Sequence, residues 1–137
     1  MLLLGSLAGC ATYREDLNRG QRLYEENQYE HALAIWRNLE PDFDSLSFKD
    51  QARYTYLRGI TDYRLGFRAD ARHWLAVARA IEQEHPGGLH AEWKQRLESS
   101  LEDLNKEVYL ARRVASNPGN TGGGGSGMSA PAHPAAP

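Results

Sequence analysis

The chain has 137 residues, a formal net charge of −2 and a sequence pI near 6.2. All of its Lys, Arg, Asp and Glu residues lie between Ala11 and Ala115, a stretch long enough for one small domain. No segment concentrates basic charge, which argues against nucleic acid or an anionic lipid surface as a partner. The single cysteine, Cys10, excludes an intramolecular disulfide and a thiolate pair for zinc.

A short apolar segment opens the chain and ends in Leu-Ala-Gly-Cys at residues 7–10. It is too short to span a bilayer, which takes about 20 residues. Its length and its small residues before Cys10 are typical of a signal peptide. We therefore predict a signal peptide over residues 1–9. It lacks the usual basic residues at its start, which a start codon placed too late would explain. The alternative is an incidental cysteine at the beginning of a helix.

The Leu-Ala-Gly-Cys motif resembles the lipobox of bacterial lipoproteins. The resemblance implies that the chain is cut before Cys10 and that the thiol of Cys10 carries a covalent lipid. Ala11 stands where lipoproteins retained in the inner membrane commonly have Asp. The resemblance therefore implies a lipoprotein of the outer membrane that faces the periplasm.

Apolar residues recur at helical spacing in five segments that turn formers separate. These segments predict helices over Tyr13–Asn27, Glu30–Glu40, Phe48–Leu65, Ala69–His85 and Leu89 to about Ala115. No segment predicts a strand. We expect Ser47 to cap the third helix and Gly66 to end it.

The end of the chain, residues 116–137, consists mainly of Gly, Ala, Pro and Ser and carries no Lys, Arg, Asp or Glu. Such a segment has almost nothing to bury, so we predict that it is disordered. The remnant of an added tag is the alternative.

Shifting the chain against itself by 39 residues aligns two helical pairs. The aligned residues are Gly20 with Gly59, Tyr24 with Tyr63, Ala32 with Ala71, Trp36 with Leu75, and Leu39 with Ala78. We expect the small residues where the first helix of each pair crosses the second, because they let the two backbones approach closely.

This pattern resembles the tetratricopeptide repeat, which has a small residue and a tyrosine in its first helix and an alanine early in its second. The resemblance implies an all-α fold. Two tetratricopeptide-like helix-turn-helix hairpins would occupy residues 10–86, and a long capping helix would follow over residues 87–115. The period is 39 rather than the usual ~34, with the extra residues in Pro41–Ser47. A generic helical bundle is the alternative.

In proteins with this repeat, the first helix of each hairpin lines a concave groove that binds a partner. Carried onto this chain, the resemblance implies a groove formed by Arg14, Leu17, Gln21, Tyr24, Arg53, Tyr56, Ile60 and Tyr63. Arg and Tyr are common anchors of protein interfaces. Burial in the core is the alternative for each of these residues.

Nothing in the sequence indicates catalysis. The histidines do not follow the spacing of H-E-x-x-H. His85 and His90 flank the turn at residues 86–88, where two exposed loop residues are more expected than a metal site. Gly122–Gly127 lacks the Lys and the following helix of a phosphate loop. We therefore expect no enzyme activity, no metal and no cofactor besides the lipid on Cys10.

The lipobox and the repeat together imply a non-enzymatic adaptor that holds another envelope protein at the outer membrane. The alternative is a structural envelope lipoprotein that self-associates through Leu89–Ala115.

The apolar stripe of the last helix, from Trp93 to Ala111, covers about 27 Å at about 1.5 Å per residue. This is longer than a short hairpin helix, so we expect Leu104, Val108 and Ala111 to overhang the hairpins. An exposed apolar stripe of this kind would contact a partner or the same helix of a second copy. The alternative is that it bends back onto Tyr13–Asn27 and closes a bundle.

Overall fold

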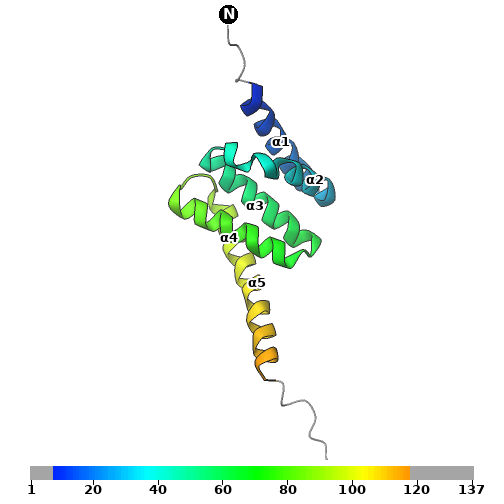
Figure 1. Cartoon of the computed structure of the whole chain (residues 1–137), viewed down its shortest axis with the longest axis vertical. Helices are drawn as coiled ribbons and strands as arrows, with labels where there is room; N and C mark the ends of the chain where they lie inside the picture. The colour runs from blue at the N-terminus through cyan, green and yellow to red at the C-terminus, as the bar shows by residue number, and fades with distance from the viewer. Residues whose placement is uncertain (1–7, 118–137) are drawn as a thin grey trace, which may run out of the picture.

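The structure is a computed structural model that describes residues 8–117, and it is all-helical there (Figure 1). Its elements are α1 (Ala8–Glu25), α2 (Tyr29–Leu39), the 3₁₀ helix η1 (Glu40–Ser45), α3 (Phe48–Leu65), α4 (Arg68–Glu84) and α5 (Ala91–Ser116). No strand occurs within residues 8–117. None of these helices is long and apolar enough to cross a membrane. Most of the predicted signal peptide and nearly all of the predicted disordered tail lie outside the described residues.

The five predicted helices are confirmed, and α3 begins and ends at the predicted residues. The other four helices differ from their predicted bounds by one or two residues, except at the start of the first helix. The first helix begins at Ala8 instead of Tyr13, so Cys10 lies in its first turn. The expected loop after α2 contains η1, with Pro41 in its first turn, where the missing N–H of proline would have no helical partner.

The ends of α3 follow from local chemistry. The Ser47 hydroxyl accepts a hydrogen bond from the Asp50 N–H at 3.2 Å, which satisfies a free donor of the first turn. Gly66 has φ = 83°. Its left-handed backbone lets the N–H of Phe67 reach the carbonyl of Asp62 at 2.9 Å. Both predicted caps are therefore confirmed.

Successive helices pack as neighbours. The pairs α1–α2 and α3–α4 each pack together, α3 contacts both helices of the first pair, and α5 packs on α3 and α4. The molecule is elongated, with the start of α1 at one end and the projecting part of α5 at the other (Figure 1).

Two glycines hold equivalent places in these pairs. A Cβ added to Gly20 of α1 would lie 2.6 Å from Cζ3 of Trp36 in α2. A Cβ added to Gly59 of α3 would lie 2.7 Å from Cγ of Leu75 in α4. No real side chain fits at such distances, so each glycine lets a large residue of the second helix lie against the backbone of the first.

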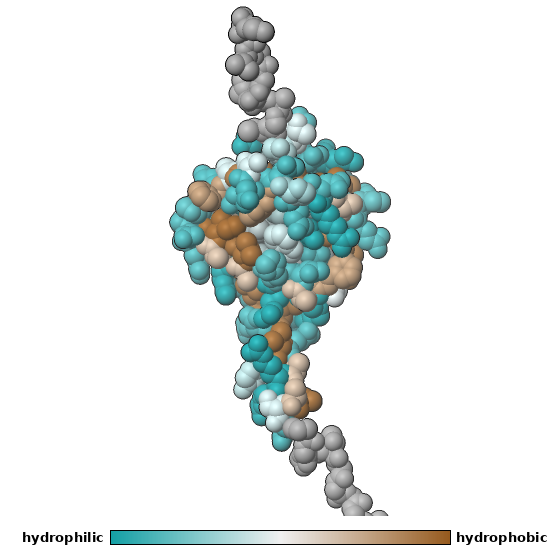
Figure 2. Space-filling model, viewed as in Figure 1, coloured by the Kyte–Doolittle hydropathy of each residue, from teal (hydrophilic) through white to brown (hydrophobic). Residues whose placement is uncertain are grey.

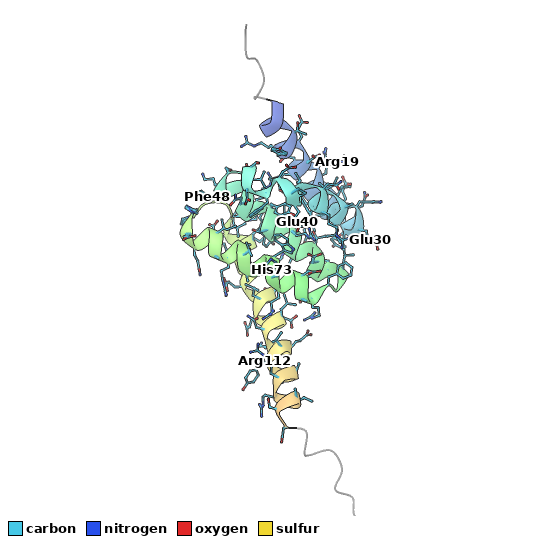
Figure 3. The ribbon with its side chains drawn as sticks, viewed as in Figure 1. Arg19, Glu30, Glu40, Phe48, His73 and Arg112 are labelled. Atoms are coloured by element: carbon cyan, nitrogen blue, oxygen red, sulfur yellow. The ribbon has the colours of Figure 1, made fainter. Side chains whose placement is uncertain are left out.

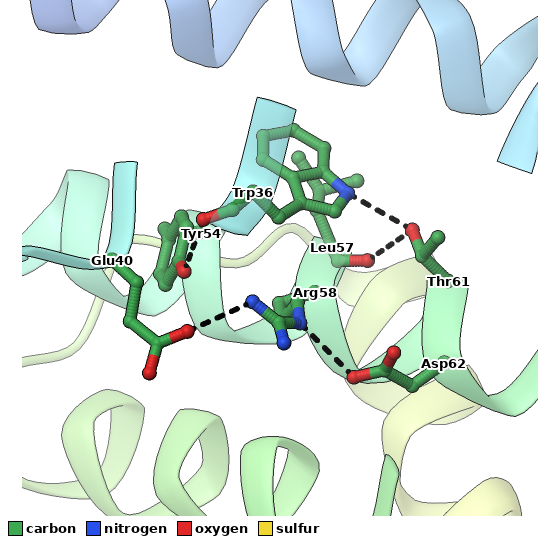
Figure 4. Close-up of polar contacts among 7 residues, drawn as sticks. All are labelled: Trp36, Glu40, Tyr54, Leu57, Arg58, Thr61 and Asp62. Atoms are coloured by element: carbon green, nitrogen blue, oxygen red, sulfur yellow. Dashed lines mark hydrogen bonds and ion pairs between the residues drawn. The ribbon is translucent and has the colours of Figure 1, made fainter. Parts of the chain in front are cut away.

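Trp36 lies at the centre of the core and is 0% exposed. Its indole N–H donates to the Thr61 hydroxyl at 3.0 Å, and its carbonyl accepts from the Tyr54 hydroxyl at 2.7 Å (Figure 4). The buried polar atoms of the ring and backbone are thus satisfied by α3. This pairing removes the cost of burying them and fixes the position of α2 on α3.

Candidate functional site

A polar groove runs along α1 beside the first half of α3, and we call it the α1–α3 groove. One part of it, of about 770 Å³, is lined by Glu15, Asp16, Asn18, Arg19, Gln21, Arg22, Glu25 and Arg53. The adjoining part, of about 610 Å³, is lined by Tyr13, Arg14, Glu15, Asn18, Ser45, Leu46, Ser47 and Asp50. Glu15 and Asn18 line both parts, so the two form one continuous surface.

Arg53 of α3 organises the groove. Its Nε donates to Oε1 of Gln21 at 2.8 Å, and its Nη2 donates to Oδ1 of Asn18 at 2.8 Å. Gln21 donates in turn to Glu25 at 2.8 Å. Partial burial lowers the pKa of Arg53, while the nearby Asp50 and Glu25 oppose that shift. Arginine stays protonated in proteins, so Arg53 can donate both hydrogen bonds and ties α3 to two amides of α1.

At the other end of the groove, Arg14 of α1 faces Asp50 of α3 at 3.5 Å. The arginine is well exposed, so this ion pair contributes little stability. Three acids and three arginines line the larger part of the groove. Such a mixed surface suits a polar segment of a partner that carries both donors and acceptors.

The structure brings together three of the eight predicted groove residues, Arg14, Gln21 and Arg53, along the α1–α3 groove. Leu17, Tyr56 and Ile60 are buried instead, at 0%, 0% and 1% exposure. They belong to the core, which was the alternative for them.

The burial of Tyr56 has a simple cause in the packing of α5. The Tyr56 ring stacks on Trp93 of α5 with the ring centroids 4.6 Å apart. Because α5 covers this side of α3, Tyr56 cannot line an open groove.

The two remaining tyrosines lie apart from the groove. The Tyr24 ring packs against Tyr29 with centroids 5.4 Å apart. The Tyr63 hydroxyl donates to Asp103 of α5 at 2.9 Å, and this hydrogen bond raises the pKa of Tyr63. Tyr63 therefore links α3 to α5.

The groove also contains residues that the sequence analysis missed, among them Asn18 and Glu25. Together with Arg14 and Gln21 they step along α1 at intervals of four, three and four residues, which places them on one helix face. That polar periodicity was visible in the sequence.

A charge cluster around the buried Arg58 joins η1, α3 and α4. Arg58 of α3 donates to Asp62 at 3.1 Å and to Glu40 at 3.2 Å (Figure 4), and it lies 5.3 Å from the ring centre of Trp74 in α4. Burial raises the pKa of Asp62, although Arg58 opposes the shift. Arg58 and Asp62 are 7% and 1% exposed, whereas Glu40 is 49% exposed, so we assign the buried Arg58–Asp62 pair to stability.

The turn before α5 is held by Glu82 of α4. Its carboxylate accepts hydrogen bonds from the N–H groups of Gly87, Gly88 and Leu89 at 2.9, 2.9 and 3.0 Å. Lys94 of α5 lies 2.8 Å away. Burial tends to raise the pKa of Glu82, but Lys94 and the three N–H groups outweigh it and lower the pKa. Glu82 thus fixes the direction in which α5 leaves the turn.

The histidines beside this turn make ring contacts. His85 stacks on Phe48 with centroids 3.7 Å apart, and His90 packs against Trp93 at 4.4 Å. Within residues 8–117 no group of three His, Cys, Asp or Glu side chains is placed to hold a metal ion.

The expectation for the long helix needs correction at one residue. Leu104 is only 2% exposed and belongs to the core, because α5 still lies against α3 and α4 there. Val108 is half-buried and Ala111 is exposed. Residues 109–117 are all exposed, so the end of α5 does not fold back onto α1. The projecting part therefore begins about one turn later than expected.

No family model, curated protein or solved structure matches the chain.

Proposed function

We propose that this protein is an outer-membrane lipoprotein of the bacterial envelope that acts as a non-enzymatic adaptor. A lipid on Cys10 anchors it, and the α1–α3 groove holds a segment of another envelope protein. The anchor is supported by the Leu-Ala-Gly-Cys motif and by the small helical domain that follows it. The groove is supported by the network of Arg53 with Asn18 and Gln21.

We also propose that the two helical pairs are tetratricopeptide-like hairpins. This is supported by the contacts of Gly20 with Trp36 and of Gly59 with Leu75, which join aligned residues of the two pairs. The aligned Ala32 and Ala71 are both 0% exposed, as expected for close helix packing.

In this proposal α5 is the capping helix. It buries Leu97, Leu101 and Leu104 on one side. The opposite side presents exposed Glu92, Gln95 and Glu102. A polar outer face is what a terminal helix of a repeat protein requires.

The arginine–amide network is the observation that carries the proposed partner site. Arg53 holds the carbonyl oxygens of Asn18 and Gln21 inward by hydrogen bonds of 2.8 Å. The side chains on the α1 face of the groove are thus ordered before a partner arrives, which lowers the entropy cost of binding. Polar, ordered side chains suit a partner segment that is itself polar.

The position of the groove relative to Cys10 suggests where that partner lies. From Cys10 to Glu25 the axis of α1 rises about 22 Å at about 1.5 Å per residue. An anchor on Cys10 would therefore keep the groove within a few nanometres of the membrane surface. We expect the partner segment to be membrane-proximal.

A photoreactive amino acid placed at Arg22 in the native host tests the groove, because Arg22 lines the groove and takes no part in the Arg53 network. We expect one envelope protein to cross-link at this position, and Arg53→Ala to reduce the yield severalfold because the network is lost. The same amino acid at Gln95, on the outer face of α5, serves as the control. Equal cross-linking from both positions, or none from Arg22, would contradict the proposal.

A further inference from the structure

The side of α4 that points away from the core borders an open groove beside α5. This groove has a volume of about 540 Å³, and we call it the α4–α5 groove. Figure 2 shows apolar side chains at the surface over α4, and Figure 3 shows His73, one of the lining residues, on this helix. The α4–α5 groove shares no lining residue with the α1–α3 groove, so it is a separate surface.

Alanines form the α4 wall of this groove. Ala69, Ala76 and Ala80 are seven and four residues apart, so they lie on one helix face. The opposite face of α4 carries Ala71 and Ala78, which are both 0% exposed in the core. On the groove side Ala69 and Ala80 are exposed and Ala76 is half-buried. The groove face of α4 is therefore small in profile and still open.

Small residues let a neighbouring helix lie close, as the contact between Gly59 and Leu75 shows within this molecule. High helix propensity alone would explain alanine at an exposed position. It does not explain Val77, a β-branched residue that lines the same groove and is half-buried. Leu101 of α5 lies at the bottom of the groove. The surface is therefore suited to apolar side chains.

The charges that line the α4–α5 groove are basic. Arg72 and Arg79 are seven residues apart on the side of α4 that borders α5, and the lining includes no Asp or Glu. Arg79 lies 3.5 Å from Glu98 of α5, just outside the lining. Arg72 is exposed and makes no ion pair with any residue in the range 8–117. One guanidinium beside the apolar wall is thus free to pair with an incoming carboxylate.

The groove continues past Arg79 into an adjoining hollow of about 310 Å³. Its lining includes Leu89 and Leu97, at 4% and 2% exposure. The two carboxylates there, those of Glu82 and Glu98, each lie within 3.5 Å of a Lys or Arg side chain. This end therefore offers apolar surface with its charges already paired, and the free cation stands at the other end.

We propose that the α4–α5 groove binds an acidic amphipathic helix of a protein partner. Apolar side chains of that helix pack on Ala69, Ala76 and Ala80, and a carboxylate at its edge pairs with Arg72. Charge complementarity selects an acidic segment over a neutral or basic one.

A helix fits this groove better than an extended segment. Backbone groups in the middle of α4 and α5 are bonded within those helices, so the walls offer no N–H or C=O to an extended chain. A helix satisfies its own backbone and needs only side-chain contacts. From Ala69 to Glu82, α4 rises about 20 Å at about 1.5 Å per residue, which matches nearly four turns of a partner helix.

This surface does not depend on the proposed adaptor function, because the α1–α3 groove lies on other residues. An adaptor with both surfaces holds two partners at once. A short, partly electrostatic contact of this kind is weak and weakens further with salt.

NMR titration of the ¹⁵N-labelled full chain carrying Cys10→Ser tests the site with synthetic peptides. The probe is a helical peptide of about four turns with Ala and Leu on one face and Glu at both edges of that face. A second peptide has Gln in place of each Glu. We expect the acidic peptide to shift amide signals of residues 69–80 and 98–105, and to bind about tenfold more tightly than the Gln peptide.

Two variants and one control accompany the titration. Arg72→Glu should weaken binding of the acidic peptide about tenfold, because a carboxylate would then face a carboxylate. Ala80→Gln should weaken it severalfold, because the longer side chain holds the helix away from α4. Arg22→Glu makes the same charge change in the α1–α3 groove and should leave the affinity unchanged. Circular dichroism must give the same melting temperature for all of these chains.

Four results would overturn the proposal. They are no binding of the acidic peptide, equal binding of the Gln peptide, signal changes confined to the α1–α3 groove, and an affinity that Arg72→Glu leaves unchanged. Vesicles of phosphatidylglycerol and of phosphatidylcholine form a further arm. Binding to phosphatidylglycerol that Arg72→Glu abolishes, with no binding of the acidic peptide, would assign the groove to lipid instead of a protein helix.

Discussion

Gly59 of α3 lies directly against Leu75 of α4, where any Cβ on the glycine would come within 2.7 Å of Leu75 Cγ. The same relationship joins Gly20 to Trp36 in the first helical pair. In both pairs the missing side chain determines how closely the two helices approach. Close packing of this kind leaves no room for added volume.

Gly59→Leu should therefore destabilise the protein by about 1–3 kcal/mol, and Ala71→Leu should behave similarly because Ala71 is 0% exposed. Urea unfolding followed by circular dichroism measures the change. Glu98→Gln, at an exposed position of α5, should change stability by less than about 0.5 kcal/mol. If both hairpin variants unfold like the unmodified chain, the close helix contacts do not exist.

The buried pair of Arg58 and Asp62 should respond differently to single and double changes. Asp62→Ala leaves the buried Arg58 with Glu40 as its remaining partner. We expect the free energy of unfolding to fall by about 3 kcal/mol. Arg58→Met combined with Asp62→Leu removes both buried charges and should recover most of that loss. Chemical denaturation compares the variants. A double variant that is as unstable as Asp62→Ala would show that the ion pair stabilises the fold in a way that apolar side chains of similar size do not.

Glu82 should make the free energy of unfolding depend on pH in the acid range. Its folded-state pKa is lowered, so its contribution is present above the unfolded pKa of about 4.3 and is lost as pH falls through the folded pKa. Glu82→Gln should cost about 1–3 kcal/mol at pH 7, because the turn loses charge-assisted hydrogen bonds. The difference from the unmodified chain should shrink below about pH 4.

Unfolding free energies measured at pH 7 and pH 3 test this expectation. Glu92→Gln, an exposed change on α5, is the control and should give no such pattern. A deficit of Glu82→Gln that stays constant with pH would be inconsistent with a charged Glu82 in the turn.

Substitutions in α5 should affect stability differently at buried Leu104 and at exposed Val114. Leu104→Glu should cost several kcal/mol, because an unpaired carboxylate would enter the core. Val114→Glu should leave the unfolding free energy nearly unchanged, because that side chain is 76% exposed. Thermal unfolding of both variants gives the comparison. Equal destabilisation would mean that residues 108–116 of α5 pack on the domain.

Local signals in the sequence were enough to predict the helices. Ser47 and Gly66 act through hydrogen bonds to residues within five positions of themselves, so they are readable without the tertiary structure. The apolar spacing within each helix is equally local. Both ends of α3 could therefore be predicted from the sequence.

The groove and the core were harder to separate, because their difference depends on which helix lies above a given face. Tyr56 and Arg53 both lie on α3, yet Trp93 of α5 covers the first and leaves the second half-exposed. The spacing of residues in α3 cannot reveal where α5 crosses it. Leu104 was misassigned for the same reason, since its burial depends on how far α3 and α4 extend along α5.

Metabolic labelling with palmitate tests the lipid anchor most directly. The labelled chain is compared with Cys10→Ser in the native host, using the upstream reading frame if translation starts before Met1. We expect label on the unmodified chain, recovery of that chain with outer membranes, and neither for Cys10→Ser. Equal labelling of the two chains, or no labelling of either, would contradict a lipid-anchored adaptor.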